Sequence, residues 1–166
     1  MSRLVELLET MPQCGQLRWI SVRPEKTGDL RVLDSAEITA ESGLEGDHFA
    51  AKPGADRQVT LIQWEHLQVV SSIVGKEVQP EQLRRNLAVA GINLLALKNQ
   101  QFAIGGQVSQ VILQGTGNCP PCSRMEENLG PGGYSAMRGH GGITARVVQG
   151  GKIAVGDPVS LLPRCE

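Results

Sequence analysis

Short runs of apolar residues, separated by turn-forming residues, make up most of this chain. Within the runs, apolar and polar positions alternate or β-branched residues cluster, which is typical of strands that bury one face. Glycine, proline, asparagine and aspartate stand between the runs. The predicted strands cover residues 17–24, 31–40, 57–63, 86–91, 101–106, 108–115, 143–149 and 152–162.

Helical spacing of apolar residues is confined to brief segments. Residues 2–10 predict a short helix, and residues 64–74 predict another that stops at Gly75, a residue suited to ending a helix. Because many short strands occur without regular strand–helix alternation, the pattern predicts a mainly β protein, a closed or nearly closed β-barrel with a few short peripheral helices. We expect residues 1–16 to be a helical appendage packed on a single barrel domain, residues 17–166.

The last two predicted strands suggest a β-hairpin. They flank Gly150 and Gly151, and a glycine pair tolerates the positive φ values that tight turns require. We therefore expect residues 143–149 and 152–162 to pair with each other.

Length and charge narrow the classes of function. The chain has 166 residues, which suits one ordinary domain, and 40% of them are hydrophobic. Its net charge of -1 gives no basic excess, so we expect neither nucleic acid nor an acidic membrane surface as a partner. The first residues include no cationic leader and no long apolar run, so we expect no membrane span and, by default, a cytoplasmic location.

Arginine is placed selectively along the chain. It supplies 11 of the 16 basic residues, and its planar fork can bind phosphate or carboxylate through two donors at once. Six arginines lie in or beside the glycine-rich and cysteine-bearing segments: Arg57, Arg84, Arg85, Arg124, Arg138 and Arg146. This placement favours an anionic small-molecule ligand, although arginine is also common on ordinary protein surfaces.

The strongest local signal is a Cys119-Pro-Pro-Cys122 loop between a predicted strand and a predicted helix. Ser123 and Glu126 have the spacing of a capping box, which would place Cys122 immediately before the helix start. A thiol there faces exposed backbone N–H groups and the positive end of the helix dipole, and Arg124 lies nearby. These surroundings favour thiolate over thiol and predict a nucleophilic Cys122.

The C-x-x-C pair admits several interpretations. A structural zinc site would need two further ligands, and the other cysteines, Cys14 and Cys165, are isolated near the two termini, so we expect no zinc. A thioredoxin-type dithiol would suit a strand-to-helix junction, but the surrounding chain lacks the βαβ pattern. The pair could also consist of one functional thiol with an incidental neighbour. In the last alternative, both cysteines are simply small buried hydrophobic residues. In a reducing compartment all four cysteines should be free thiols.

Two glycine-containing segments could approach a ligand closely. Residues 139–142, Gly-His-Gly-Gly, follow Arg138 and open a predicted strand, so they do not form a P-loop, but their backbone could form an anion-binding nest. An ordinary loop is the alternative, and His140 by itself establishes neither metal binding nor catalysis. Further upstream, a glycine-containing turn ends in Asp47-His48, where Asp47 could orient His48 or act only as a turn-former.

Six segments follow one another along the chain: GLEGDH, RQVTLI with WEHL, RRNLAVAGINLLAL, FAIGG, CPPC and RGHGGITARVVQGGKIAVGD. Together they strongly resemble the MOSC domain, named from the C-terminal domain of molybdenum cofactor sulfurases. The resemblance extends from about residue 17 to residue 159. It implies a compact β-barrel-like fold, a cleft for a pterin-type molybdenum cofactor, and a family cysteine that matches Cys122.

The resemblance also implies which residues hold the cofactor. Arg84 and Asn86 fall in the family's R-x-N step, while Arg57 and Arg146 occupy basic positions that could bind the cofactor's phosphate. Cys122 would be a ligand to molybdenum or a carrier of sulfane sulfur. The candidate cofactor-binding residues are Arg57, Arg84, Asn86, Arg138, His140, Gly141 and Arg146.

Two functions of different classes follow from the resemblance. In the first, the protein is a molybdenum-dependent enzyme that reduces N-hydroxylated bases or related compounds, with Cys122 as ligand to the metal. In the second, it is a non-catalytic module that holds the cofactor, or a Cys122 persulfide, for transfer to a partner. A thiol oxidoreductase using Cys119 and Cys122 as its catalytic pair is a third alternative. The chain carries neither a pyridoxal-phosphate-dependent desulfurase portion nor an electron-transfer domain, so we expect a separate protein to supply sulfur or electrons.

Overall fold

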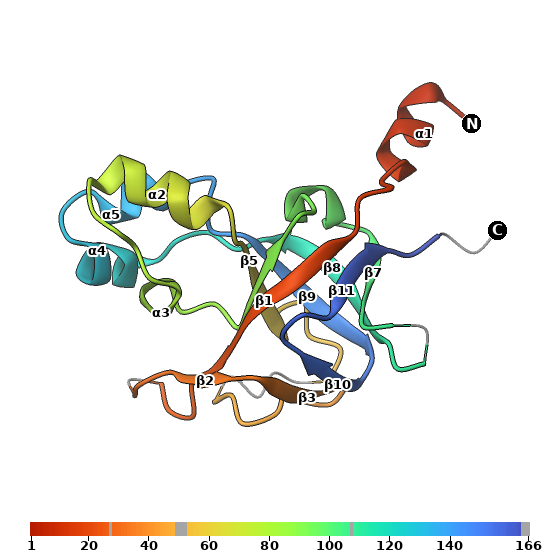
Figure 1. Ribbon diagram of the computed structural model, residues 1–166, viewed down its shortest axis with the longest axis horizontal. Helices are drawn as coiled ribbons and strands as arrows, with labels where there is room; N and C mark the ends of the chain where they lie inside the picture. Colours follow the sequence, from red (N-terminus) through yellow and green to blue (C-terminus); the bar gives the residue numbers. More distant parts are fainter. Residues whose placement is uncertain (27, 49–52, 107, 164–166) are drawn as a thin grey trace.

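A closed ring of strands forms the centre of the molecule (Figure 1). The computed structural model describes residues 1–26, 28–48, 53–106 and 108–163. Within them, the ring strands are β1 (Gly15–Val22), β5 (Val59–Gln63), β6 (Leu87–Ala90), β7 (Gln101–Ile104), β8 (Val111–Asn118), β9 (Ile143–Gln149) and β11 (Pro158–Leu161). Their order is β1–β6–β5–β9–β8–β7–β11, and β11 pairs back onto β1. The predicted mainly β, closed barrel is therefore confirmed.

Apolar side chains from alternate strand positions fill the barrel. In β8, Val111, Leu113 and Gly115 are buried and the residues between them are only half-buried. All five residues of β5 are buried, because one face of that strand points into the barrel and helices cover the other. Leu61 thus belongs to the barrel core, and its neighbour Ile62 belongs to a second core beneath the helices.

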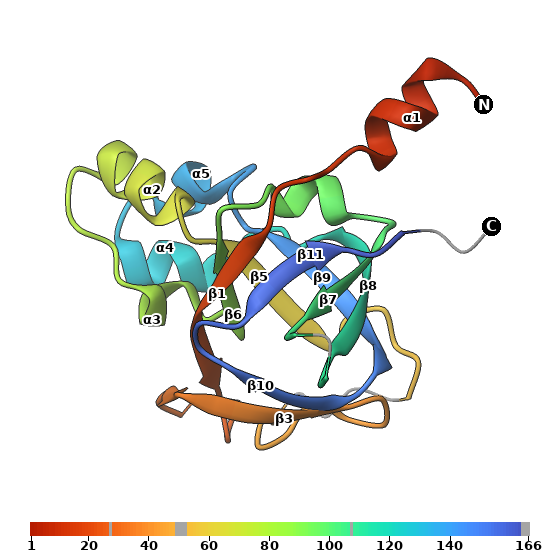
Figure 2. The same ribbon diagram turned by 45° about the vertical axis from the view of Figure 1, so that its right-hand side comes forward.

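Four short helices gather on one side of the barrel (Figures 1 and 2). They are α2 (His66–Val74), α3 (Pro80–Leu83), α4 (Ser123–Leu129) and α5 (Gly133–Met137), and a 3-10 helix (Leu94–Leu97) lies elsewhere on the barrel. The second core holds them together through residues such as Val70, Leu83, Met125 and Met137. As predicted, α2 ends at Gly75, whose φ of 78° is left-handed. In the described ranges no helix combines the length and the apolar character that a membrane span requires.

The second sheet overturns the predicted hairpin. It contains β3 (Ser35–Thr39), β4 (Gly43–Leu44) and β10 (Gly151–Ala154), and it lies at one end of the barrel (Figure 2), where β2 (Arg31–Leu33) pairs with β1. β10 pairs with β3, whereas β9 pairs with β5 and β8. At Gly150 the chain passes so close to β3 that a Cβ atom would lie 2.4 Å from the carbonyl oxygen of Ile38. The glycine pair therefore carries the chain across to the second sheet instead of folding it back.

The N-terminal helix α1 (Arg3–Glu9) forms as predicted but is not packed on the domain. None of its residues is buried, and Leu4, Leu7 and Leu8 are 65%, 57% and 59% exposed. The helix stands away from the barrel in both views (Figures 1 and 2). The expectation that it packs was wrong, because in this segment it is Met11, beyond the end of the helix, that reaches the barrel core.

Candidate functional site

The cysteine loop connects the end of β8 to α4. Cys119 is buried, and its backbone N–H donates to the carbonyl oxygen of Gly142 across a distance of 2.9 Å. Cys122 is exposed and is the N-cap residue of α4, so the thiol stands directly before the helix as predicted. Both are free thiols, as is the exposed Cys14, while Cys165 lies outside the described residues.

The predicted capping box does not form. The helix begins at Ser123, one residue earlier than a capping box would require, and no side chain caps its first turn. Glu126 instead accepts hydrogen bonds from the backbone N–H groups of Gly132 and Tyr134, at 2.7 Å and 2.9 Å. These bonds lower the pKa of Glu126. The carboxylate therefore caps α5, and its own helix keeps free N–H groups beside Cys122.

Arg85 is a buried cation that fixes the cysteine loop in place. Its guanidinium donates to the carbonyl oxygens of Gly141, Leu83 and Pro120, at 2.9 Å, 3.1 Å and 3.4 Å. Burial lowers its pKa, and the neighbouring thiol of Cys119 acts in the opposite direction. One guanidinium thus joins the end of α3, the cysteine loop and the glycine-rich loop before β9.

Arg84 lies beside Cys122 in a strained conformation. Its φ of 56° is left-handed, which is uncommon for a residue with a side chain. Its guanidinium donates to the carbonyl oxygen of Gly28 at 3.4 Å, but its buried Nε has no hydrogen-bond partner in the described part of the chain. Burial lowers the pKa of Arg84, the charges of Arg124 and Arg23 lower it further, and Cys122 opposes them.

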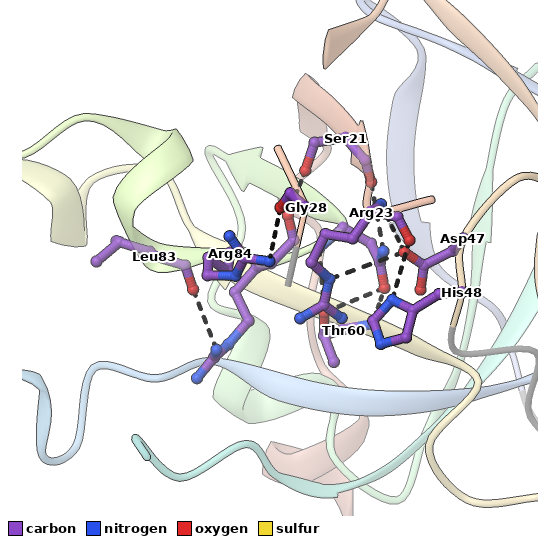
Figure 3. A network of polar contacts seen from close by, with 10 residues as sticks. Ser21, Arg23, Gly28, Asp47, His48, Thr60, Leu83 and Arg84 are labelled. Atoms are coloured by element: carbon purple, nitrogen blue, oxygen red, sulfur yellow. Dashed lines mark hydrogen bonds and ion pairs between the residues drawn. The ribbon is translucent and has the colours of Figure 1, made fainter. Parts of the chain in front are cut away.

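Arg23 is held beside Arg84 by the turn that ends in Asp47-His48 (Figure 3). Asp47 Oδ1 accepts from the backbone N–H of Arg23 at 2.7 Å and lies 3.8 Å from its Nε. The backbone N–H of His48 donates to the carbonyl oxygen of Arg23 at 2.6 Å, and His48 Nδ1 lies 2.9 Å from the same oxygen. Sequence reasoning singled out Asp47 and His48 but missed Arg23, because the residues that hold it lie more than twenty positions away.

Asn86 and Arg146 have other partners in the structure. Asn86 is buried: its Oδ1 accepts from the N–H and hydroxyl of Thr60, and its Nδ2 donates to the carbonyl oxygen of Ser21. It ties β1, β5 and β6 together beneath Arg84. Arg146 forms a largely exposed ion pair with Asp56 at 3.3 Å.

Five arginines form what we call the arginine cluster, centred on Arg84 and Arg85, two residues on which Cys122 also acts electrostatically. The charges of its members act on Arg84 or Arg85, and Arg57 belongs to it because it lowers the pKa of Arg85. Asp47 pairs with Arg23 and Asp29 acts on Arg84, so cations outnumber the carboxylates that these contacts identify. The cluster consists of Arg23, Arg57, Arg84, Arg85 and Arg124.

The remaining predicted residues lie in or beside a cavity of 560 Å³. Cys119 is among the residues that line this cavity, and Cys122 is not. Arg138 and Gly141 are in its wall, and His140 contacts the wall residue His66. Sequence reasoning missed His66, which lies at the start of α2 with only one acidic neighbour to mark it. The structure thus divides the predicted site between two sides of the cysteine loop.

No group of three metal-ligating His, Cys, Asp or Glu side chains occurs in the described ranges. A metal here would therefore have to bring most of its own ligands. The expected absence of a structural zinc stays a prediction.

The fold and site define a class: a closed β-barrel that presents an exposed thiol at a strand-to-helix junction, near a cluster of arginines. A family model for the MOSC domain matches residues 46–160, and the chain belongs to that family. No curated protein matches it in sequence.

Solved structures share the fold across most of this chain. The YuaD protein of Bacillus subtilis has 20% identity and a TM-score of 0.77, covering 92% of this chain and 98% of its own. YiiM of Geobacillus stearothermophilus has 19% identity and a TM-score of 0.72, covering 90% and 76%. YiiM of Escherichia coli has 19% identity and a TM-score of 0.66, covering 91% and 71%. At these identities the comparison establishes the fold alone.

Proposed function

We propose that the protein binds a molybdenum–pterin cofactor at Cys122 and the arginine cluster, and uses it to reduce N-hydroxylated compounds. The observation that carries the proposal is the exposed Cys122 thiol beside Arg84, whose backbone is left-handed and whose buried Nε lacks a partner. Strain of this kind costs on the order of 1–3 kcal/mol and is typical of functional sites. Membership of the MOSC domain family supports the same site.

The donor set of the site fits an anionic cofactor. Arg84 and Arg23 would bind the phosphate, because guanidinium groups form charge-assisted bonds to phosphate oxygens and each of these has a buried Nε without a hydrogen bond. Arg124 adds positive charge without entering the core. Like charges held this close repel one another, so an anion between them would relieve the repulsion.

The thiol fits the metal. Cys122 offers a soft sulfur donor in an exposed position directly before α4. A molybdenum held by its pterin needs few protein ligands, which agrees with the scarcity of ligating side chains here. When bound, the cofactor would supply two-electron reduction chemistry. Arg85 would keep the thiol in position through its bonds to the loop and its neighbours.

Sulfur transfer is a second candidate function. Cys122 is exposed at the molecular surface, where it could attack the outer sulfur of a donor protein's persulfide and release the donor's thiol, whereas Cys119 on the same loop is buried. In this function Cys122 would carry a persulfide to a partner, and the arginine cluster would bind the acceptor cofactor.

An activity assay separates the two candidates. Protein made in a host that synthesises the cofactor would be mixed with an N-hydroxylated amidine and a reduced viologen dye, which supplies two electrons for each N–O bond cleaved. We expect wild type to form the amidine and water, Cys122→Ser to be inactive, and Cys14→Ser, which alters an exposed thiol elsewhere, to match wild type. Wild type that holds molybdenum but reduces nothing would instead support sulfur transfer.

A further inference from the structure

The cavity on the Cys119 side of the cysteine loop is a built pocket that the proposed cofactor site does not use. Its volume of 560 Å³ lies within the range of about 300–1,000 Å³ typical of small-molecule sites. Its apolar wall consists of Leu94, Leu95, Pro120, Pro121 and Ile143. Its polar wall includes His66, Asn93, Asn118, Tyr134 and Arg138.

Close backbone packing fixes one wall of this cavity. A Cβ atom on Gly141 would lie 2.0 Å from the carbonyl oxygen of Cys119, and one on Gly142 would lie 1.8 Å from that of Leu61. Both contacts are far below the approach that real Cβ atoms make, so the glycine-rich loop can lie against the cysteine loop only without side chains there. The wall is therefore preformed rather than assembled around a ligand.

His66 lines the cavity and has one of its two ring nitrogens engaged by His140. Its Nδ1 lies 3.2 Å from His140 Nδ1, and the two rings meet edge to face at 89°. One proton must lie between the two nitrogens, so the contact leaves His66 Nε2 for a molecule in the cavity. Burial lowers the pKa of His66, the charge of His140 lowers it further, and Glu65 opposes them, so these surroundings favour the neutral ring.

Arg138 gives the cavity its charge. It is exposed, lines the pocket, and forms no ion pair within the described part of the chain. The rings of Pro120, Pro121 and Tyr134 also line the cavity, and ring surfaces suit a ligand with a planar body. The cavity therefore combines a cation, an imidazole and apolar walls, and no carboxylate occurs among the described residues that line it.

We propose that this cavity binds a small organic acid with a flat apolar body, whose carboxylate pairs with Arg138 and whose edge contacts His66. The carboxylate accepts two parallel hydrogen bonds from the guanidinium, and the body lies against Pro120 and Pro121. This ligand site is separate from the arginine cluster and goes beyond the proposed function.

Calorimetric titration of the purified protein tests the site with defined probes. Benzoate and indole-3-carboxylate supply the anion and the flat body, benzamide lacks the charge, and benzylamine reverses it. We expect the two acids to bind at one site per chain, benzamide to bind at least about tenfold more weakly, and benzylamine not to bind. Arg138→Gln should weaken both acids at least about tenfold, and His66→Phe should weaken them too.

Arg31→Gln is the matched control, because it removes an exposed arginine from β2 and should leave the affinities unchanged. The proposal is overturned if neither acid binds at about 10 mM, if benzylamine binds as tightly as benzoate, or if Arg138→Gln binds both acids like wild type. Circular dichroism would show whether each variant is folded. The titration needs no bound molybdenum, so its failure would leave the proposed cofactor site standing.

Discussion

Arg84 combines a left-handed backbone with a guanidinium that the protein itself leaves partly unpaired. A residue with a Cβ pays about 1 kcal/mol or more for that backbone relative to glycine. The side chain at this position therefore carries a cost that glycine would avoid, which is consistent with a role for its guanidinium.

Two truncations of Arg84 separate its backbone strain from its side chain. We expect Arg84→Gly to be more stable than Arg84→Ala by about 1 kcal/mol in urea unfolding, because only glycine adopts a φ of 56° without strain. Both variants should lose bound pterin. At the strand residue Arg31 the same pair of changes should favour alanine. If the alanine variant of Arg84 is the more stable one, the strain argument fails.

Cys122 should be the most reactive thiol of the chain. It is exposed and stands before open helix N–H groups and beside arginines, whereas Cys119 is buried and Cys14 lies outside the arginine cluster. Brief iodoacetamide treatment near neutral pH, followed by mass spectrometry, should therefore label Cys122 before Cys14, Cys119 and Cys165. Equal labelling of all four, or none at Cys122, would remove it from the site.

The position of Cys122 could be predicted from the sequence because its signals are local: a strand, a short loop and a helix follow one another. The role of Arg23 could not, because it depends on Asp47 and His48 in a distant turn. The role of His66 could not be predicted either, because it depends on the contact that His66 makes with His140 in the folded chain.

Among the elements, the glycine-rich loop before β9 supports both sides of the site. Gly142→Ala should destabilise the protein by about 2–3 kcal/mol more than Gly139→Ala, as measured by urea unfolding. Both residues have left-handed φ values, 85° and 82°, but only at Gly142 would the new Cβ meet backbone, at Leu61 O, 1.8 Å away. Equal losses of stability would mean that the loop does not pack as described.

Element prediction succeeded where burial follows the strand or helix period and failed where pairing is non-local. The hairpin predicted at Gly150-Gly151 was wrong, because the strand after these glycines pairs with β3, more than a hundred residues earlier in the chain. Likewise, the spacing of the leucines in α1 correctly predicted a helix. The helical period of apolar residues does not show whether another part of the protein buries them.

At the scale of the whole molecule, barrel closure brings distant segments to one loop. The ends of β1 and β8 and the starts of β6 and β9 meet around Cys119 and Cys122, although they span most of the chain. The closed barrel itself could be predicted from many short strands and few helices. The division of the site into two sides could not be predicted. This division depends on the direction in which each cysteine of the loop faces.

The most direct test of the central claim is the molybdenum content of the protein purified from a host that makes the cofactor. We predict about one molybdenum and one pterin for each wild-type chain, and the same for Cys14→Ser. Cys122→Ser should lose the metal while its circular dichroism stays unchanged, because a serine hydroxyl is a harder and largely protonated donor of similar size. Wild-type protein without molybdenum, or Cys122→Ser with as much of it as wild type, would contradict the account.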